Sequence, residues 1–251
     1  MRGINLRSKA SGLLICGFVL SAGEAVADPQ QDKFDAGLAA LERQHYATAV
    51  RAWTEIALSG SATAQNNMGL LYERGLGVTQ NFSSAMDWYE KAEKSGSLEA
   101  THNIGMLYIY GKGVSKSWSR ALHYFTKVER DVPESRHMVG LSFFQGDGQI
   151  QDRSQAFQRF LSSALDGYEP AQYMTAYMLL DGTNIQRNVL QSYAWAKLAS
   201  LGERDVAPNE ELLLAAGSQL SHEDIERASI IVAQCTTYGM PACSDGLLSL
   251  L

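Results

Sequence analysis

Apolar residues recur at every fourth position in the central part of the chain, and this spacing predicts amphipathic helices. Ala64, Met68 and Tyr72 form the clearest apolar stripe. The stripe returns 36 residues later at Ala100, Ile104 and Tyr108. Such spacing is typical of a helix with one buried face. Repetition with this period predicts stacked structural units, because one unit is too small to bury its own apolar face.

Each unit also carries a pair of turn-forming residues, which predicts where its first helix ends. Glycine ends a helix readily, because without a Cβ atom it adopts the left-handed conformation at no steric cost. The four helix-ending glycines are Gly75, Gly111, Gly146 and Gly182. Two residues further on, the chain has Gly77, Gly113, Gly148 and Asn184. Asparagine tolerates the left-handed conformation best after glycine, so we expect a tight turn in all four units.

A second helix is predicted to follow each turn. It is expected to start after a residue whose side-chain oxygen can accept hydrogen bonds from the first free N–H groups. These N-cap residues are Asn81, Ser117, Asp152 and Asn188. Four residues later comes a small residue, which would let the two helices approach closely: Ala85, Ala121, Ala156 or Ser192. We expect the large aromatic residues Trp88, Tyr124 and Trp195 to fill the space between layers.

The pattern therefore predicts an all-α solenoid of helix pairs. We expect a repeat region over residues 28–204, with units at about 33–61, 62–97, 98–132, 133–168 and 169–203. The first unit is atypical, because His45 is a poor N-cap. Residues 205–251 are expected to form a helical cap with helices at 209–220 and 222–235, the second opened by Ser221 and Asp224. This cap would cover the apolar face of the last unit.

The first 27 residues have the three-part pattern of a secretory signal. Three basic residues precede an apolar run over 13–20, and Ala25-Val26-Ala27 follows. The run is about half of the roughly 20 residues that a membrane-spanning helix needs. We therefore expect cleavage after Ala27 and export, without an integral membrane span. Lipidation at Cys16 is a weaker alternative.

Charge and cysteine content narrow the classes of partner. Loss of residues 1–27 removes three basic residues and one acidic residue, which changes the formal net charge from −6 to −8. A chain with this acidic excess is not expected to bind nucleic acid. Two cysteines remain, Cys235 and Cys243. In an exported chain an isolated pair predicts a disulfide, whereas two thiols alone make a poor metal site.

A search for catalytic chemistry identifies no candidate, so we predict neither an enzyme nor a cofactor or metal site. The Gly-x-Gly elements follow helices rather than strands, which favours turns over a nucleotide loop. His222-Glu223 lacks a second histidine one turn later, and the common serine acyl-transfer motifs are absent from the sequence. His102 and His137 occupy equivalent positions that would lie about 10 Å apart on neighbouring helices, too far to share one metal.

The unit from Ala64 to Ala92 resembles the Sel-one-like repeat family, which is related to the tetratricopeptide repeat. The resemblance rests on Ala-x-x-x-Met-Gly-x-x-Tyr-x-x-Gly-x-Gly-Val, then Asn, Ala and Trp-Tyr-x-Lys-Ala, and covers about residues 35–202. It implies a right-handed α-solenoid of antiparallel helix pairs. The end of the chain, with Cys235, Tyr238 and Cys243, is similar to the tail of exported bacterial members, which implies a periplasmic location.

In the tetratricopeptide relatives, the face of the first helix opposite the core holds a partner segment. With Asn66 as the reference and 100° per residue, Leu70 and Glu73 lie within about 40° of it. The same positions in the four units define a predicted groove column of Asn66, Leu70, His102, Met106, Ile109, His137, Leu141, Phe144, Tyr173, Tyr177 and Leu180. Packing of these side chains on the neighbouring first helix is the alternative.

The function expected from this resemblance is a periplasmic scaffold or adaptor that binds another envelope protein or peptide segment in the groove. Two alternatives stay open. Cysteine-rich relatives have been assigned β-lactamase or penicillin-binding roles, but those relatives carry a cysteine pair in each repeat. Recognition of cell-wall glycan is the second alternative, because aromatic columns also suit sugars. The sequence leaves the oligomeric state open.

Overall fold

The computed structural model describes residues 29–202 and 207–250, so the predicted signal segment and its cleavage site lie outside the described residues. The described residues form helices and no strand. The helices are α1 (Pro29–Glu42), α2 (Tyr46–Leu58), α3 (Ala62–Arg74), α4 (Phe82–Lys94), α5 (Leu98–Tyr110), α6 (Trp118–Val128), α7 (Pro133–Gln145), α8 (Arg153–Leu165), α9 (Glu169–Asp181), α10 (Val189–Ser200), α11 (Ala207–Gly217), α12 (His222–Tyr238) and α13 (Met240–Leu248). The predicted all-α solenoid is confirmed.

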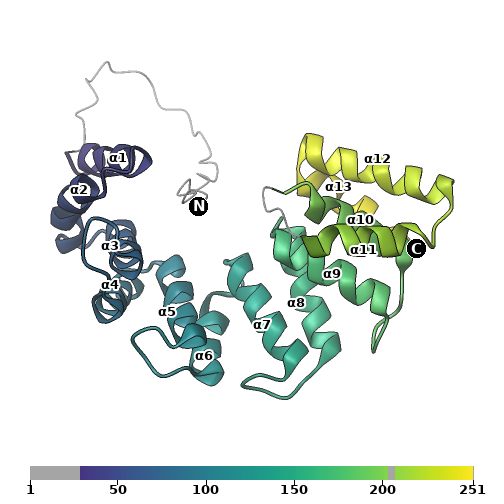
Figure 1. The fold of residues 1–251 in the computed structure, drawn as a ribbon, viewed down its shortest axis with the longest axis horizontal. Helices are drawn as coiled ribbons and strands as arrows, with labels where there is room; N and C mark the ends of the chain where they lie inside the picture. Colours follow the sequence, from purple (N-terminus) through teal and green to yellow (C-terminus); the bar gives the residue numbers. More distant parts are fainter. Residues whose placement is uncertain (1–28, 203–206, 251) are drawn as a thin grey trace, which may run out of the picture.

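Successive helices pack against one another from α1 to α11, which makes a stack of helix pairs. Figure 1 shows these pairs along a curve, with α3 and α5 on its inner side and α4 and α6 on its outer side. The first helices of the other units occupy equivalent positions in the repeat. The inner side of the curve is therefore built from the first helix of each pair.

The predicted helix ends are confirmed in all four units. The helices end at Gly75, Gly111, Gly146 and Gly182, each in the left-handed conformation. Asn184 takes the turn position with φ of 61°, as expected. At Gly77 the reason for glycine is also spatial, because a Cβ atom there would lie 2.5 Å from the backbone carbon of Tyr46. This turn therefore rests directly on the start of α2.

The predicted N-caps of the second helices are confirmed as well. The side chain of each cap accepts a hydrogen bond from the backbone N–H three residues later, at Asn81, Ser117, Asp152 and Asn188. His45 makes no side-chain cap bond. Each such cap contributes about 1 kcal/mol to helix stability, so the repeat is specified locally as well as by packing.

The core contains one large aromatic ring per unit. The predictions for Trp88 and Tyr124 are wrong, because the neighbouring Tyr89 and Phe125 are the buried rings. The fully buried rings are Trp53, Tyr89, Phe125, Phe160 and Trp195. Trp88 is only half-buried, with Lys91 Nζ 4.3 Å above its ring centroid, and Tyr124 is also half-buried. The difference has a steric cause. The ring at Tyr89 lies against Gly69 on the first helix of its unit, where a Cβ atom would come within 2.4 Å of it.

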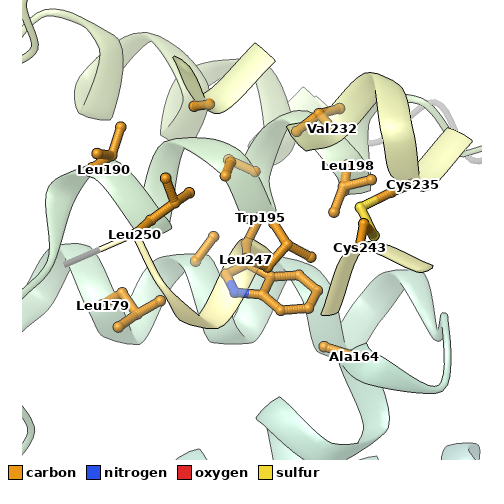
Figure 2. Packing of buried hydrophobic residues seen from close by; sticks show 14 of the residues in the cluster. Ala164, Leu179, Leu190, Trp195, Leu198, Val232, Cys235, Cys243, Leu247 and Leu250 are labelled. Atoms are coloured by element: carbon orange, nitrogen blue, oxygen red, sulfur yellow. A yellow bond between two sulfur atoms is a disulfide. The ribbon is translucent and has the colours of Figure 1, made fainter. Parts of the chain in front are cut away.

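A three-helix cap closes the C-terminal end of the stack. Helix α11 packs on α10, while α12 packs on α10 and on α13. Figure 2 shows Trp195 of α10 among side chains of the cap, including Val232 and Leu247. The predicted disulfide between Cys235 and Cys243 is present and joins α12 to α13, with 5.1 Å between the Cα atoms. Sequence analysis did not predict α13.

Candidate functional site

The predicted groove column divides into three rows, which differ in exposure. The row at Leu70, Met106, Leu141 and Tyr177 stays accessible: the first three are half-buried and Tyr177 is 37% exposed. In the other two rows, Asn66, Ile109 and His137 are buried. His102, Phe144, Tyr173 and Leu180 are half-buried. The structure therefore brings the column together on one side of the stack but turns part of it inward.

The row that begins at Asn66 lies between neighbouring first helices rather than on their open face. Asn103 on α5 donates a hydrogen bond from Nδ2 to Oδ1 of Asn66 on α3, at 3.0 Å. His102 Nδ1 lies 2.8 Å from Oγ of Ser135 on α7. These contacts link α3 to α5 and α5 to α7. The Asn66 row therefore stabilises the stacking of the inner helices.

His102 is held as a neutral side chain. Burial lowers its pKa to about 4, and its ring lies 5.4 Å from that of Phe125. Ser135, its partner, is fully buried. A serine with a nearby histidine is an arrangement found in nucleophilic catalysis, but a nucleophile needs access to its substrate. This pair is therefore a packing contact between units.

The third row consists of Ile109, Phe144 and Leu180, with Glu73 at the equivalent position of α3, and it also makes contacts within the fold. Glu73 accepts hydrogen bonds from Tyr89 Oη at 2.8 Å and from Lys112 Nζ at 2.9 Å. Phe144 lies between two rings, with centroid distances of 6.3 Å to Phe160 and 6.1 Å to Tyr177. Only part of Phe144 therefore remains for a ligand.

The accessible face of the first helices is centred beyond the predicted column. Each position of the first helix can be described by its rotation around the helix axis from Asn66, at 100° per residue. Positions 63, 67, 70 and 74 lie at about 60°, 100°, 40° and 80°. The centre of the exposed face is therefore rotated by about 70° from Asn66. We call the accessible residues at these positions the inner stripe. It consists of Thr63, Leu70, Arg74, Glu99, Asn103, Met106, Tyr110, Glu134, Met138, Leu141, Gln145, Pro170, Met174, Tyr177 and Asp181.

Most of the inner stripe was missed by sequence reasoning. A signal was present, because the charged residues Glu99 and Glu134 recur at one position of the first helix, where a buried column would not place them. The centre of the stripe is apolar. Met106 and Met138 pack against one buried cluster, and Leu141 and Met174 pack against the next, so half-buried apolar side chains line this face on α5, α7 and α9.

The C-terminal end of this face is aromatic. Tyr173 and Tyr177 lie on α9, and Glu211 of α11 is close enough to affect Tyr173. Burial raises the pKa of the Tyr173 hydroxyl, and the neighbouring Tyr177 and Glu211 raise that pKa further. Tyr173 therefore stays protonated at neutral pH and can donate a hydrogen bond.

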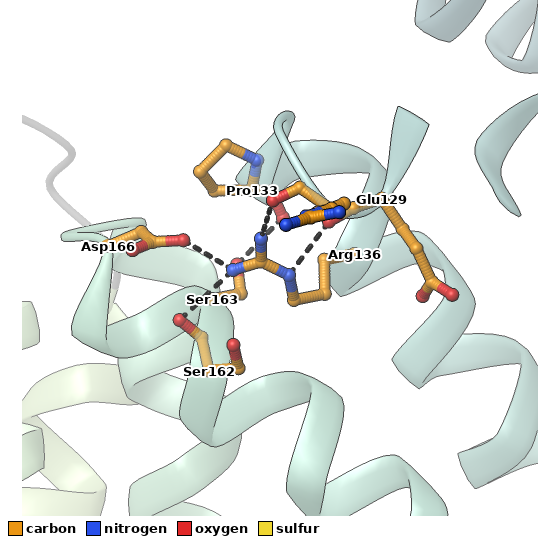
Figure 3. A network of polar contacts seen from close by, with 7 residues as sticks. Glu129, Pro133, Arg136, Ser162, Ser163 and Asp166 are labelled. Carbon is orange, nitrogen blue, oxygen red and sulfur yellow. Dashed lines mark hydrogen bonds and ion pairs between the residues drawn. The ribbon is translucent and has the colours of Figure 1, made fainter. Parts of the chain in front are cut away.

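A hollow of about 350 Å³ opens elsewhere, at the junction of α6, α7 and α8, and it is lined by Glu129, Arg130, Arg136, Gln158, Arg159 and Ser162. Figure 3 shows that the guanidinium of Arg136 is surrounded by acceptors. It donates to the backbone oxygens of Glu129, Arg130 and Ser162 and pairs with Asp166. These contacts use four of its five N–H groups, so Arg136 mainly stabilises the contact between units.

Residues 29–202 and 207–250 contain no group of three or more histidine, cysteine or acidic side chains that could hold a metal ion. Within the same ranges, no helix combines the length and the apolar character that crossing a membrane requires. The inner stripe is therefore the candidate site.

Comparisons with known proteins agree with this architecture. The family model "Sel1 repeat" matches residues 62–97, 98–127, 133–168 and 169–202. No curated protein matches the chain. A Sel1 repeat protein from Oxalobacter formigenes has a similar structure, with a TM-score of 0.63, 19% identity, and coverage of 86% of this chain and 96% of that one.

A second similar structure is c5321, a protective antigen of uropathogenic Escherichia coli strains that displays an SLR fold. The TM-score is 0.61 with 21% identity, and the match covers 83% of this chain. It covers 50% of c5321, so the chain spans about half the length of that protein. At these identities the two structures support the fold alone. Because the family model matches four repeats over more than half of the sequence, the chain belongs to the Sel1 repeat family.

Proposed function

We propose that this protein is a periplasmic scaffold or adaptor that binds a segment of another envelope protein along the inner stripe. Sel1 repeat proteins are generally non-catalytic and typically mediate protein–protein interactions. The observation that carries the proposal is that Met106, Met138, Leu141, Met174 and Tyr177 are accessible apolar side chains on the same face of three successive first helices. Contiguous accessible apolar surface on a folded domain usually marks an interaction site.

The periplasmic location is a separate part of the proposal. It is supported by the three-part pattern of the first 27 residues and by the Cys235–Cys243 disulfide, because disulfides persist in oxidising compartments. N-terminal sequencing of the protein from an envelope fraction should begin at Asp28. Recovery of a chain that begins at Met1, or of a lipid on Cys16, would contradict it.

Site-specific photo-crosslinking tests the binding surface. A photoreactive amino acid at Met138 on the inner stripe should capture a partner in the envelope of the producing cell, whereas the same amino acid at exposed Lys94 of α4 should not. Tyr177→Ala should weaken the complex by about 2 kcal/mol, because large aromatic anchors dominate such interfaces. Its melting temperature should change little, since Tyr177 is 37% exposed and loses mainly its ring contact with Phe144.

The opposite pattern would sink the proposal. Capture from Lys94 but not from Met138 would place the binding surface on the outer helices. If Tyr177→Ala lowers the melting temperature while the folded fraction binds as before, the inner stripe serves packing only. Capture of glycan strands instead of a polypeptide would replace the protein partner with a cell-wall ligand.

A further inference from the structure

The two sides of the curve differ in charge. The first helices, α1, α3, α5, α7 and α9, carry eight acidic and three basic residues between them. The second helices, α2, α4, α6, α8 and α10, carry four acidic and eight basic residues. Four of the eight acidic residues, Asp32, Glu99, Glu134 and Glu169, lie in the first turn of their helix, a position that the helix dipole also favours. The inner side is therefore acidic relative to the outer side.

The contacts of individual residues sharpen this difference. Two of the three basic residues on the first helices are directed away from the inner face. Lys33 pairs with Glu55 of α2 at 2.6 Å, and Arg136 is enclosed in the network described above. Arg74 is the remaining one, and it is exposed on the inner stripe. Little positive charge is thus available to neutralise the inner carboxylates.

Several acidic residues on the inner side remain exposed. Glu73 and Asp181 pair with Lys112 and Arg153 and contribute little net charge. By contrast, Asp35, Glu42, Glu99 and Glu134 are exposed, and none of them forms an ion pair with another described residue. Asp35 and Glu42 lie on α1 at the positions equivalent to Asn67 and Arg74. Glu99 and Glu134 lie on α5 and α7, the helices that carry Met106, Met138 and Leu141, while Asp35 and Glu42 extend the acidic side onto α1.

We propose that the occupant of the inner stripe is a cationic, amphipathic polypeptide segment. Its apolar side chains pack on Met106, Met138 and Leu141, and its lysine or arginine side chains face Glu99 and Glu134. Methionine suits this role, because its flexible side chain adapts to different apolar partners. Complementary charge selects such a segment over a neutral or acidic one and speeds its association. The inference rests on the proposed function and adds the chemistry of the partner.

Two labelled peptides test the charge preference by fluorescence anisotropy. Both have 16 residues and the same apolar positions, and they differ in carrying lysine or glutamate at every polar position. The lysine peptide should bind the mature protein at least tenfold more tightly than the glutamate peptide in 50 mM salt. This preference should shrink severalfold in 500 mM salt, because the carboxylates are exposed and salt screens them. Equal binding of the two peptides, or tighter binding of the glutamate peptide, would overturn the inference.

Two matched triple variants distinguish the effect of the inner carboxylates on peptide binding from the effect of the net charge of the protein. The inner variant combines Asp35→Asn, Glu99→Gln and Glu134→Gln. The control combines Asp87→Asn, Glu90→Gln and Glu226→Gln on α4 and α12, with the same change in net charge. The inner variant should bind the lysine peptide at least fivefold more weakly, and the control should change binding less than twofold. Equal losses would show general attraction by net charge and would overturn the inference.

The photo-crosslinking result distinguishes this inference from the proposed function. If a partner is captured from Met138 but the peptides show no charge preference, the function stands and the charge inference fails. If the lysine peptide binds with the expected preference and its crosslinks map to Met138, both are supported. Failure of both the capture and the peptide binding would remove the proposed function and the inference with it.

Discussion

Replacing Gly105 with alanine would test how the two helices of one unit are held together. Gly105 lies on α5 directly against the ring of Phe125 on α6, and an added Cβ atom would lie 2.4 Å from Cε1 of that ring. Carbon atoms normally approach to about 3.5 Å, so the ring would have to move by about 1 Å. Phe125 is fully buried, so this movement would displace its neighbours.

Two opposing effects decide the magnitude. Overpacking of a core costs about 1–3 kcal/mol, whereas alanine is better than glycine in a helix interior by about 1 kcal/mol. Because the contact is far shorter than normal and the ring cannot move into solvent, we expect overpacking at the upper end of its range, about 3 kcal/mol, and thus a net loss of about 2 kcal/mol. For a chain of this size, this corresponds to a fall in Tm of about 4–8 °C.

Thermal and urea unfolding followed by circular dichroism measure this loss. The Phe125→Leu background provides the control, because a smaller side chain leaves room for the added methyl group. Gly105→Ala should therefore cost clearly less in that background than in the parent. A Gly105→Ala protein that melts at or above the parent temperature would refute the reasoning. So would an equal cost in both backgrounds.

Three further predictions concern stability. Tyr89→Ala should destabilise the protein by about 3–5 kcal/mol in urea unfolding and Trp88→Ala by less than half as much, because only Tyr89 is fully buried; similar losses would contradict this assignment. His102 has a pKa of about 4 when folded and about 6.5 when unfolded, so its contribution is complete above pH 6.5 and falls as the pH drops toward 4. We expect a loss of about 2 kcal/mol between pH 7.5 and pH 5, and His102→Gln should remove most of that difference. Reduction of the Cys235–Cys243 disulfide, which closes a loop with a sequence separation of 8, should lower the free energy of unfolding by about 2–3 kcal/mol, and an unchanged urea midpoint in dithiothreitol would count against it.

The helix ends were predictable because their chemistry is local. Gly75 and Asn81 specify a turn through their own backbone and side-chain preferences, and the same pair of preferences recurs in each unit. Neighbouring units do not change these preferences. The order and type of the helices in the repeat region therefore followed from the sequence.

The rotation of the inner face was not predictable in the same way, because it depends on contacts between units. Asn66 looks accessible when α3 is considered alone, but it is buried beside the next unit, where Asn103 of α5 donates a hydrogen bond to it. The ring at Tyr89 was misplaced although Ala85, Tyr89 and Ala92 follow helical spacing and are all buried. Helix α13 gave no periodic signal, because it has nine residues that include a proline and a glycine.

Hydrogen bonds between the last unit and the end of the chain limit which repeat units could replace one another during evolution. Asn188 caps α10 with its side-chain oxygen and, through Nδ2, donates to the backbone oxygen of Leu250 at 2.6 Å. Gln191 donates to the backbone oxygens of Leu247 and Leu248. No other unit combines both amides, because the equivalent pairs are Asn81 with Ser84, Ser117 with Arg120, and Asp152 with Gln155. Duplication or loss of a whole unit is therefore compatible with this architecture upstream of α9, whereas a copy of an inner unit in the last position would lose at least one of these contacts to the end of the chain.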